Sequence, residues 1–533
     1  MNGGSGNEVI SFTIAAMQFN PVLGEVEENR RRLVSRLAEA AENGAKLVVF
    51  PEMASSGYVW ESREEIAPFV ETIPGPTTEA LLAVTRKFRC YAAVGLPETD
   101  AWSGAYYNSA VLIGPEGVVG KYRKTHLFAA DPRWAREGDQ EIPVFQTEIG
   151  RIALLICMDA MYFEPSRIAA LQGADIIAFP TNWVGASNNP PSKTWCLRAK
   201  ENGLYWAASN RSDTERGAVF TGGSAVIEPD GSVQQSLISG EGIVYGQARL
   251  DPAKRRNILE ARRPHAYQEL LLHPYLWKEG ETRPISAPES YEVIIPKLLR
   301  SGRAEQLAAR IRLSLEEIND HLKHAVHRLI VLPELESFPS PSAGELEFFF
   351  AELQRLAFVY NGYFAISLLE EVGGRPVPSV YLVGPEGKIG TYRQVHRGRP
   401  ERRRGEADSV FRTFELPFAR VGILTEGDAL FPESYRVLAK QGADVIAVCG
   451  AGQANDAAWM QRIWAFENDA VLAAAMPAGS SGSQLFLHRQ VHLEQDSREG
   501  ALVGTVHAQM LETARSRPFM RRSKTHLYGR LIE

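Results

Sequence analysis

Short apolar runs alternate with amphipathic segments along the first half of the chain. The runs FTIAAMQ (12–18), LVVF (47–50) and YAAVG (91–95) predict strands, and helical spacing of apolar positions predicts helices near 25–43 and 77–89 between them. Further strand-like runs follow at NSAVLIG, IALLIC, DIIAFP, YWAAS and GSAVI. An alternation of strands with helices that have one apolar face predicts an α/β fold.

The second half of the chain repeats the first. GPEGVVGKYRKTH (114–126) recurs as GPEGKIGTYRQVH (384–396), with eight of thirteen positions identical. VVFPE, QGAD and the pair Glu-Asn recur in the same order. A repeat of this length is a duplicated domain and not a solenoid unit.

The repeat and a break in the hydrophobic pattern define the expected domain boundaries. We expect a flexible tail at 1–9, a first domain at 10–262, a linker or extension at 263–290 that is rich in Arg, Pro and Glu, and a second domain at 291–533. Each domain is long enough to bury its own core.

Composition excludes several classes of function. The formal charge of the 533 residues is −6 with both signs interspersed, so we expect no nucleic-acid partner. The apolar runs fall short of the ~18 to 20 residues that cross a bilayer, so no membrane partner is expected. The start, MNGGSGNEV, lacks the basic and apolar regions of a signal peptide, and four scattered cysteines form no disulfide framework or metal motif. We therefore expect a cytoplasmic protein.

Three reactive side chains lie next to apolar strands of the first half. Glu52 ends LVVFPE, Lys124 follows GVVGKY, and Cys157 ends IALLIC. Burying each group alone is costly, whereas together they satisfy one another, so we expect them to converge at one sheet edge. Such a set suits acyl transfer through a thioester: Cys157 is the nucleophile, Glu52 the proton acceptor, and the Lys124 ammonium stabilises the oxyanion.

One rival assignment uses a histidine. His126 follows Lys124 by two residues and is a candidate partner for Cys157 in a papain-like Cys-His couple. Nothing in the sequence places a third, orienting group beside this histidine.

These segments resemble the nitrilase, or carbon-nitrogen hydrolase, superfamily. VVFPEMASSGY, GKYRKTHLF, LLICMDAMYFEPSR and RAKENGLYWAASNRS carry the likeness, in order, from about residue 10 to residue 260. The resemblance implies two αββα-sandwich domains in this duplicated chain, no metal or organic cofactor, and a Glu52–Lys124–Cys157 triad. It also implies a second carboxylate after the lysine. Here that position holds Asp131, where the family usually has glutamate, with Glu137 as the other candidate.

The resemblance also narrows the reaction. Cys157 is followed by Met158-Asp159, which is closer to amide-cleaving members than the Trp-Glu of nitrile-cleaving ones. Hydrolysis of a small linear amide is therefore expected, with nitrile hydrolysis or acyl transfer to an amine as alternatives that share the thioester. The resemblance places three aromatic residues at the pocket mouth, which suggests an apolar or aromatic acyl group: Tyr58, Trp134 and Trp183.

The second half has lost the triad. Aligned without gaps, Cys157 corresponds to Glu426 and Lys124 to Gln394, and only Glu334 keeps its identity. We expect residues 291–533 to be a catalytically inactive domain. Members of the family dimerise near the active site, so the resemblance implies an intrachain pseudo-dimer, with a further homo-oligomer possible. A non-catalytic scaffold for the whole chain is the alternative from another class.

Overall fold

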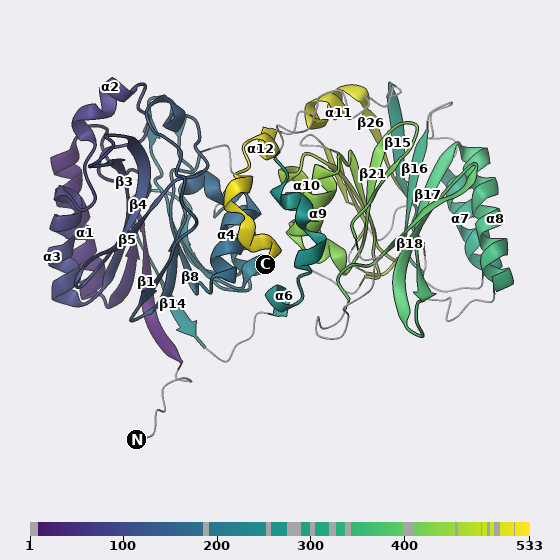
Figure 1. The fold of residues 1–533 in the computed structure, drawn as a ribbon, viewed down its shortest axis with the longest axis horizontal. Coiled ribbons are helices and arrows are strands. Elements are labelled where there is room, and N and C mark those ends of the chain that lie inside the picture. The colour runs from purple at the N-terminus through teal and green to yellow at the C-terminus, as the bar shows by residue number, and fades with distance from the viewer. Residues whose placement is uncertain are drawn as a thin grey trace, which may run out of the picture. The chain divides into compact units, whose positions relative to one another are not determined.

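A computed structural model describes most of the chain. The described residues are 9–184, 191–251, 257–273, 289–298, 304–318, 327–335, 343–397, 410–452, 457–480, 482–487, 491–494, 501–515 and 518–533. The chain divides into two compact units (Figure 1). Unit 1 comprises residues 1–260 together with 526–531 and 533, and unit 2 comprises 261–525 and 532.

Unit 1 contains a first six-stranded sheet with two long helices. Its strands run in the order β14 (Gly242–Leu250), β1 (Ile10–Gln18), β2 (Ala45–Val49), β3 (Tyr91–Thr99), β4 (Tyr106–Gly114) and β5 (Gly117–Arg123). Helices α1 (Val26–Glu42) and α3 (Pro76–Phe88) contact each other and pack on this sheet. Leu33 and Leu37 of α1 are buried against it, as the helical spacing predicted.

A second six-stranded sheet faces the first within unit 1. Its order is β13 (Val233–Leu237), β12 (Ser224–Ile227), β9 (Tyr205–Ser209), β8 (Ile176–Pro180), β7 (Gly150–Leu154) and β6 (Val144–Thr147). Strand β1 contacts β9 and β12, and α4 (Phe163–Leu171) packs against α5 (Lys193–Asn202). The short elements are α2 (Arg63–Ile66), β10 (Thr214–Glu215), β11 (Ala218–Val219) and α6 (Asn257–Glu260). Two sheets with helices outside them form the predicted αββα sandwich.

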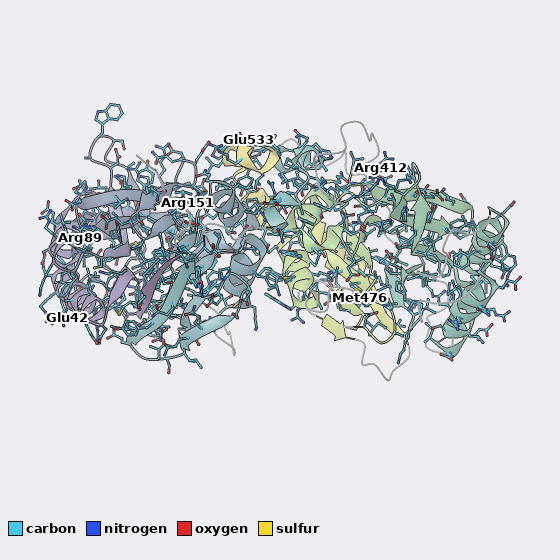
Figure 2. The ribbon with its side chains drawn as sticks, turned by 90° about the horizontal axis from the view of Figure 1, so that it is seen from below. Glu42, Arg89, Arg151, Arg412, Met476 and Glu533 are labelled. Carbon is cyan, nitrogen blue, oxygen red and sulfur yellow. The ribbon has the colours of Figure 1, made fainter. Side chains whose placement is uncertain are left out.

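The core of unit 1 lies between the two sheets and beneath the helices. Aliphatic residues of β1, β2 and β3 are fully buried there. Charged side chains such as Glu42 and Arg89 lie at the surface (Figure 2). The sequence therefore places its apolar positions inward on every central strand, as the near-continuous apolar runs of parallel strands require.

Unit 2 repeats this topology. One sheet has the order β19 (Gly387–Arg393), β18 (Pro376–Gly384), β17 (Gly362–Glu371), β16 (Arg328–Glu334), β15 (Ser290–Ile295) and β26 (Leu502–His507). The other has β20 (Thr413–Glu415), β21 (Arg420–Thr425), β22 (Val445–Cys449), β23 (Val471–Ala475), β24 (Gln484–Leu487) and β25 (Val491–Glu494). The helices are α7 (Ala304–Ile318), α8 (Ala343–Tyr360), α9 (Pro432–Lys440), α10 (Ala458–Glu467), α11 (Ala508–Arg515) and α12 (Pro518–Arg521).

The units differ from the expected domain boundaries at two places. Residues 261–273, which we expected to end the first domain and to begin its linker or extension, belong to unit 2; they contain two 3₁₀ turns, in which Tyr267 and Leu270 are buried. Residues 526–531, expected in the second domain, belong to unit 1, where Tyr528 and Leu531 are buried. Within the described ranges, no helix has the length and apolar character needed to cross a membrane.

Candidate active site

Glu52 lies in a turn that follows β2 at the edge of the first sheet. The carboxylate is fully buried, and the next residue, Met53, has a left-handed backbone with φ of 53°. This turn packs directly on β3, since a Cβ atom at Gly95 would lie 2.5 Å from the Glu52 Cα. Glycine at position 95 is therefore required for the close approach that places Glu52 at the sheet edge.

Lys124 lies between two buried carboxylates. Its Nζ donates to Glu52 Oε1 at 2.7 Å and to Asp131 Oδ2 at 2.6 Å, and all three side chains are fully buried. Asn108 on β4 joins the same cluster, donating from Nδ2 to Glu52 Oε1 at 2.8 Å and to Asp131 Oδ1 at 3.0 Å. Phe128 N donates to Asp131 Oδ2 as well. Sequence reasoning did not identify Asn108, whose amide offers no distinctive signal within an apolar strand.

Burial and the neighbouring charges both act on the pKa values of Glu52 and Lys124, and the net effect raises both. Burial raises the pKa of Glu52 above its ordinary value, the Lys124 charge opposes that rise, and the Asp131 charge adds to it. Burial alone would lower the pKa of Lys124, but the Asp131 and Glu52 carboxylates outweigh it and raise that pKa well above its usual range. Lys124 is therefore held as an ammonium, and Glu52 accepts a proton more readily than an ordinary glutamate does.

Cys157 follows β7 at the first residue of the 3₁₀ turn η3 (Cys157–Met161). Its backbone is left-handed, with φ of 44°, and the residue is 4% exposed. Burial and the Glu52 charge raise the pKa of the thiol to about 12, against the opposing effects of the Lys124 charge and of the nearby Thr181 side chain and Asn182 backbone. Cys157 therefore lies within electrostatic reach of both predicted partners.

Asn182, just after β8, joins Glu52 to the second sheet. Its backbone N donates to Glu52 Oε2 at 2.9 Å, and its side-chain Nδ2 donates to the Glu52 carbonyl at the same distance. The Asn182 backbone also lowers the pKa of the Cys157 thiol, so Asn182 lies near both the base and the nucleophile. Asn182 was likewise not identified from the sequence, although its place after the DIIAFP strand is equivalent to that of the triad residues.

Asp159 holds the turn that carries Cys157. Its Oδ2 accepts from the backbone N of Ile156 and from Tyr122 OH, both at 2.9 Å. Its Oδ1 pairs with His126 Nδ1 at 2.8 Å, and His126 Nε2 pairs with Tyr528 OH at 3.2 Å. Both ring nitrogens of His126 are thus engaged away from Cys157, which contradicts the papain-like couple.

The predicted aromatic residues are placed differently from one another. Tyr58 and Trp134 belong to one buried apolar cluster, and the Lys124 Nζ lies 5.9 Å from the centre of the Tyr58 ring. Trp183 is half-buried and packs edge-on against Trp195, with ring centres 5.5 Å apart. Tyr58 and Trp134 are therefore buried beside the Glu52–Lys124–Asp131 cluster and do not form the exposed pocket mouth that we expected. Glu137, the other candidate for the second carboxylate, is exposed.

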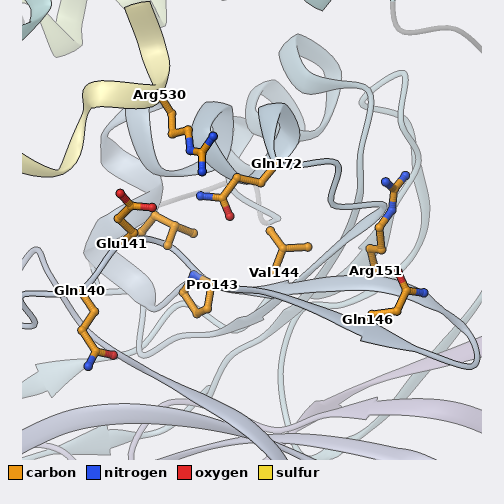
Figure 3. A pocket seen from close by; sticks show the side chains of 9 residues that line it. Gln140, Glu141, Pro143, Val144, Gln146, Arg151, Gln172 and Arg530 are labelled. Atoms are coloured by element: carbon orange, nitrogen blue, oxygen red, sulfur yellow. The ribbon is translucent and has the colours of Figure 1, made fainter. Parts of the chain in front are cut away.

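A surface cavity of about 650 Å³ lies elsewhere in unit 1 (Figure 3). Its lining includes Glu141, Arg151, Gln172 and Arg530 and none of the triad residues. Arg151 is paired with Asp175 at 3.2 Å. No group of three or more His, Cys, Asp or Glu residues in the described ranges is arranged to hold a metal ion.

The equivalent positions of unit 2 have different partners. Glu426, in the place of Cys157, accepts from Ala451 N at 2.6 Å through Oε2. Gln394, in the place of Lys124, donates to the His396 carbonyl at 2.5 Å, and Glu334 Oε2 accepts from Ser367 Oγ at 3.4 Å. In place of a thiol and an ammonium, this unit therefore presents an extra carboxylate and an amide.

Comparison with known proteins places both halves in one family. The carbon-nitrogen hydrolase family matches residues 13–256 and again residues 299–512. A nitrilase of Pyrococcus abyssi is 36% identical over 245 residues, which are 46% of this chain and 91% of that protein. The human omega-amidase NIT2 is 33% identical over 257 residues, which are 45% of this chain and 89% of that protein.

An amidase from Nesterenkonia sp. with a known crystal structure is 26% identical, with a TM-score of 0.42, and the match covers 50% of this chain and 98% of that one. Because the family matches the chain twice, the duplication predicted from the internal repeats is confirmed. The chain is a tandem member of the carbon-nitrogen hydrolase (nitrilase) family.

Proposed function

We propose that unit 1 hydrolyses the C–N bond of a small linear amide through a thioester on Cys157. The observation that carries this proposal is the buried Glu52–Lys124–Asp131 cluster beside a thiol in a left-handed turn. Two carboxylates and one ammonium without solvent are costly to bury, and such groups concentrate where chemistry uses them.

The first step is attack by sulfur with simultaneous loss of its proton. With a thiol pKa of about 12, roughly one molecule in 100,000 carries a free thiolate at pH 7, so a resting thiolate is not the attacking species. Glu52 accepts the proton as the S–C bond forms. Its raised pKa suits this role, because a base with a pKa nearer to neutrality also returns the proton effectively.

The Lys124 ammonium stabilises the oxyanion of the tetrahedral intermediate. Two carboxylates fix its position before the reaction, and a preorganised donor of this kind is worth about 3 to 4 kcal/mol. Glu52 then gives its proton to the leaving nitrogen, the C–N bond breaks, and ammonia or an amine departs. Glu52 next takes a proton from water, the hydroxyl attacks the thioester carbonyl, and the carboxylic acid leaves as Cys157 regains its proton.

Amide hydrolysis is favoured over the alternatives because Met158-Asp159, after the nucleophile, resembles amide-cleaving members of the family more closely than the Trp-Glu of nitrile-cleaving ones. One relative is an omega-amidase and another a nitrilase, and both reactions share the thioester.

The four cysteines are all free and buried, which supports a reducing compartment such as the cytoplasm.

We propose further that unit 2 has no hydrolytic activity of its own. Glu426 offers no thiol for a thioester, and Gln394 offers no charge for an oxyanion. The alternative for the whole chain, a scaffold without catalysis, predicts neither turnover nor a covalent adduct in unit 1.

The test is a panel of amides, nitriles and N-carbamoyl compounds, assayed for release of ammonia or amine. Cys157→Ala should abolish turnover, whereas Cys90→Ala, which removes another buried thiol, should keep it. Mass spectrometry with a slow substrate should show an acyl adduct on Cys157, and added hydroxylamine should divert it to a hydroxamate. Turnover that survives Cys157→Ala would refute the mechanism. A wild-type protein that shows neither turnover of any compound in the panel nor a covalent adduct would support the scaffold alternative.

A further inference from the structure

Two short segments of the chain share a spacing of residues and an unexpected place in the fold. His265-Ala266-Tyr267-Gln268-Glu269-Leu270 and His526-Leu527-Tyr528-Gly529-Arg530-Leu531 both read His-x-Tyr-x-x-Leu. The first segment follows the sequence of the first domain but belongs to unit 2, and the second ends the chain but belongs to unit 1. Each unit therefore binds the tail that the other domain's sequence supplies.

In unit 1 the tail residue Tyr528 contacts the buried side chain of His126. Tyr528, 2% exposed, places its OH 3.2 Å from His126 Nε2, and His126 Nδ1 lies 2.8 Å from Asp159 Oδ1. The imidazole also stacks on Tyr162, with ring centres 4.0 Å apart. Both ring nitrogens of His126 are therefore engaged, one by the Asp159 carboxylate and the other by the Tyr528 hydroxyl.

Unit 2 contains the same arrangement. Tyr267 OH lies 2.6 Å from His396 Nε2, and His396 Nδ1 lies 2.7 Å from Asp428 Oδ1. His396 stacks on Phe431 at 3.6 Å, and Tyr392 OH donates to Asp428 Oδ2 at 2.6 Å. Because this unit has lost the thiol and the ammonium, the Tyr-His-Asp arrangement binds the tail independently of any chemistry.

The far end of the arrangement in unit 1 is the catalytic turn. Asp159 accepts from Ile156 N, the backbone group directly before Cys157, and from the backbone N of His126, two residues after Lys124. One carboxylate therefore ties the segment of the nucleophile to the segment of the ammonium. Tyr528, in the C-terminal segment, contacts His126, and His126 in turn contacts the Asp159 carboxylate.

We propose that Tyr528 is a positioning residue for the active site of unit 1, and that the C-terminal segment 526–531 helps to hold this site in its working geometry by binding His126. The inference rests on the proposed function of unit 1. It also assigns a task to the inactive domain, whose sequence supplies the tail on which the active unit depends.

The two tails provide matched variants in the full-length protein. Tyr528→Phe and Tyr267→Phe each remove one hydroxyl from an equivalent buried bond, and Leu531→Ala and Leu270→Ala each loosen an equivalent buried tail. Tyr528→Phe and Leu531→Ala should lower kcat by about 3- to 10-fold with KM nearly unchanged, because the tail orders the reacting groups without forming part of the triad. Tyr267→Phe and Leu270→Ala should leave kcat at the wild-type value, although their thermal midpoints fall similarly.

A second measurement needs no turnover. The rate at which iodoacetamide alkylates Cys157, followed by peptide mass spectrometry, reports the geometry of the turn directly. It should change by at least about 3-fold in Tyr528→Phe and stay at the wild-type rate in Tyr267→Phe. Equal alkylation rates in the two variants overturn the inference even if amides are hydrolysed, whereas a selective change supports it even if the proposed substrate class fails.

Discussion

Replacing Asp131 by asparagine isolates the second carboxylate of the site. Asp131 Oδ2 accepts from Lys124 Nζ at 2.6 Å and from Phe128 N at 3.0 Å, and Oδ1 accepts from Asn108 at 3.0 Å. The substitution keeps the size of the side chain and removes its charge. Lys124 then retains only the Glu52 carboxylate as an anionic partner within the described site.

The structure sets both the size and the sign of the effect. A hydrogen bond to a charged group is worth about 1.5 to 3 kcal/mol, which corresponds to a loss of roughly 10- to 150-fold in kcat/KM. The Asp131 charge is also one cause of the raised pKa of Glu52. Its removal should lower that pKa and move the acid limb of the pH profile to lower pH.

The assay is kcat/KM for one amide substrate between about pH 4 and about pH 10, for wild type, Asp131→Asn and Glu137→Gln. Glu137 lies in the same segment but is exposed, so its amide variant should match wild type. A full rate in Asp131→Asn, or a loss confined to Glu137→Gln, refutes the assignment. A lower rate with an unmoved acid limb would show that Asp131 acts on Lys124 but not on the base.

Three further outcomes follow from the same geometry. The wild-type kcat/KM should rise with pH through the raised pKa of Glu52, which must be deprotonated, and should stay level to about pH 10, because the pKa of Cys157 is about 12 and that of Lys124 is also raised. Lys124→Met should lower kcat at least about 100-fold and cost about 3 to 5 kcal/mol in unfolding free energy by urea titration, since two buried carboxylates lose their counter-charge. Burial would raise the pKa of Asp428, but hydrogen bonds from His396 outweigh it and lower that pKa. The free energy of unfolding of unit 2 should therefore decrease as pH falls below the ordinary aspartate pKa, and Asp428→Asn should abolish that dependence.

Local pattern in the sequence was sufficient to predict an α/β fold and to select the residues of the candidate triad, whereas the αββα sandwich was implied by the family resemblance. Apolar runs locate the parallel strands and therefore the edge of the sheet where those strands end. A charged or reactive residue at the end of such a run is costly to bury, so its presence there indicates a function. Glu52, Lys124 and Cys157 all meet that condition. The two domains could likewise be predicted, because whole segments recur in order.

The supporting partners could not be predicted in this way. Asn108 and Asn182 are neutral amides whose role depends on which strands become neighbours, and a single sequence does not record that. The contact between His126 and Tyr528 spans 402 positions, across a complete second domain. The shared His-x-Tyr-x-x-Leu spacing was the available signal, although spacing alone does not show that each tail belongs to the other unit.

Comparison of the two units shows which part of the site is specific to chemistry. Asp159 accepts from Ile156 N and Asp428 accepts from Thr425 Oγ1, so each binds the end of an equivalent strand. Each also pairs with a histidine that contacts a tail tyrosine. Cys157 nevertheless has a φ of 44°, whereas Glu426 is absent from the described non-glycine residues with positive φ. A non-glycine residue held in this region costs about 1 to 3 kcal/mol. The scaffold and its tail are therefore compatible with a relaxed turn in unit 2, and of these two equivalent turns only the one that carries Cys157 is left-handed.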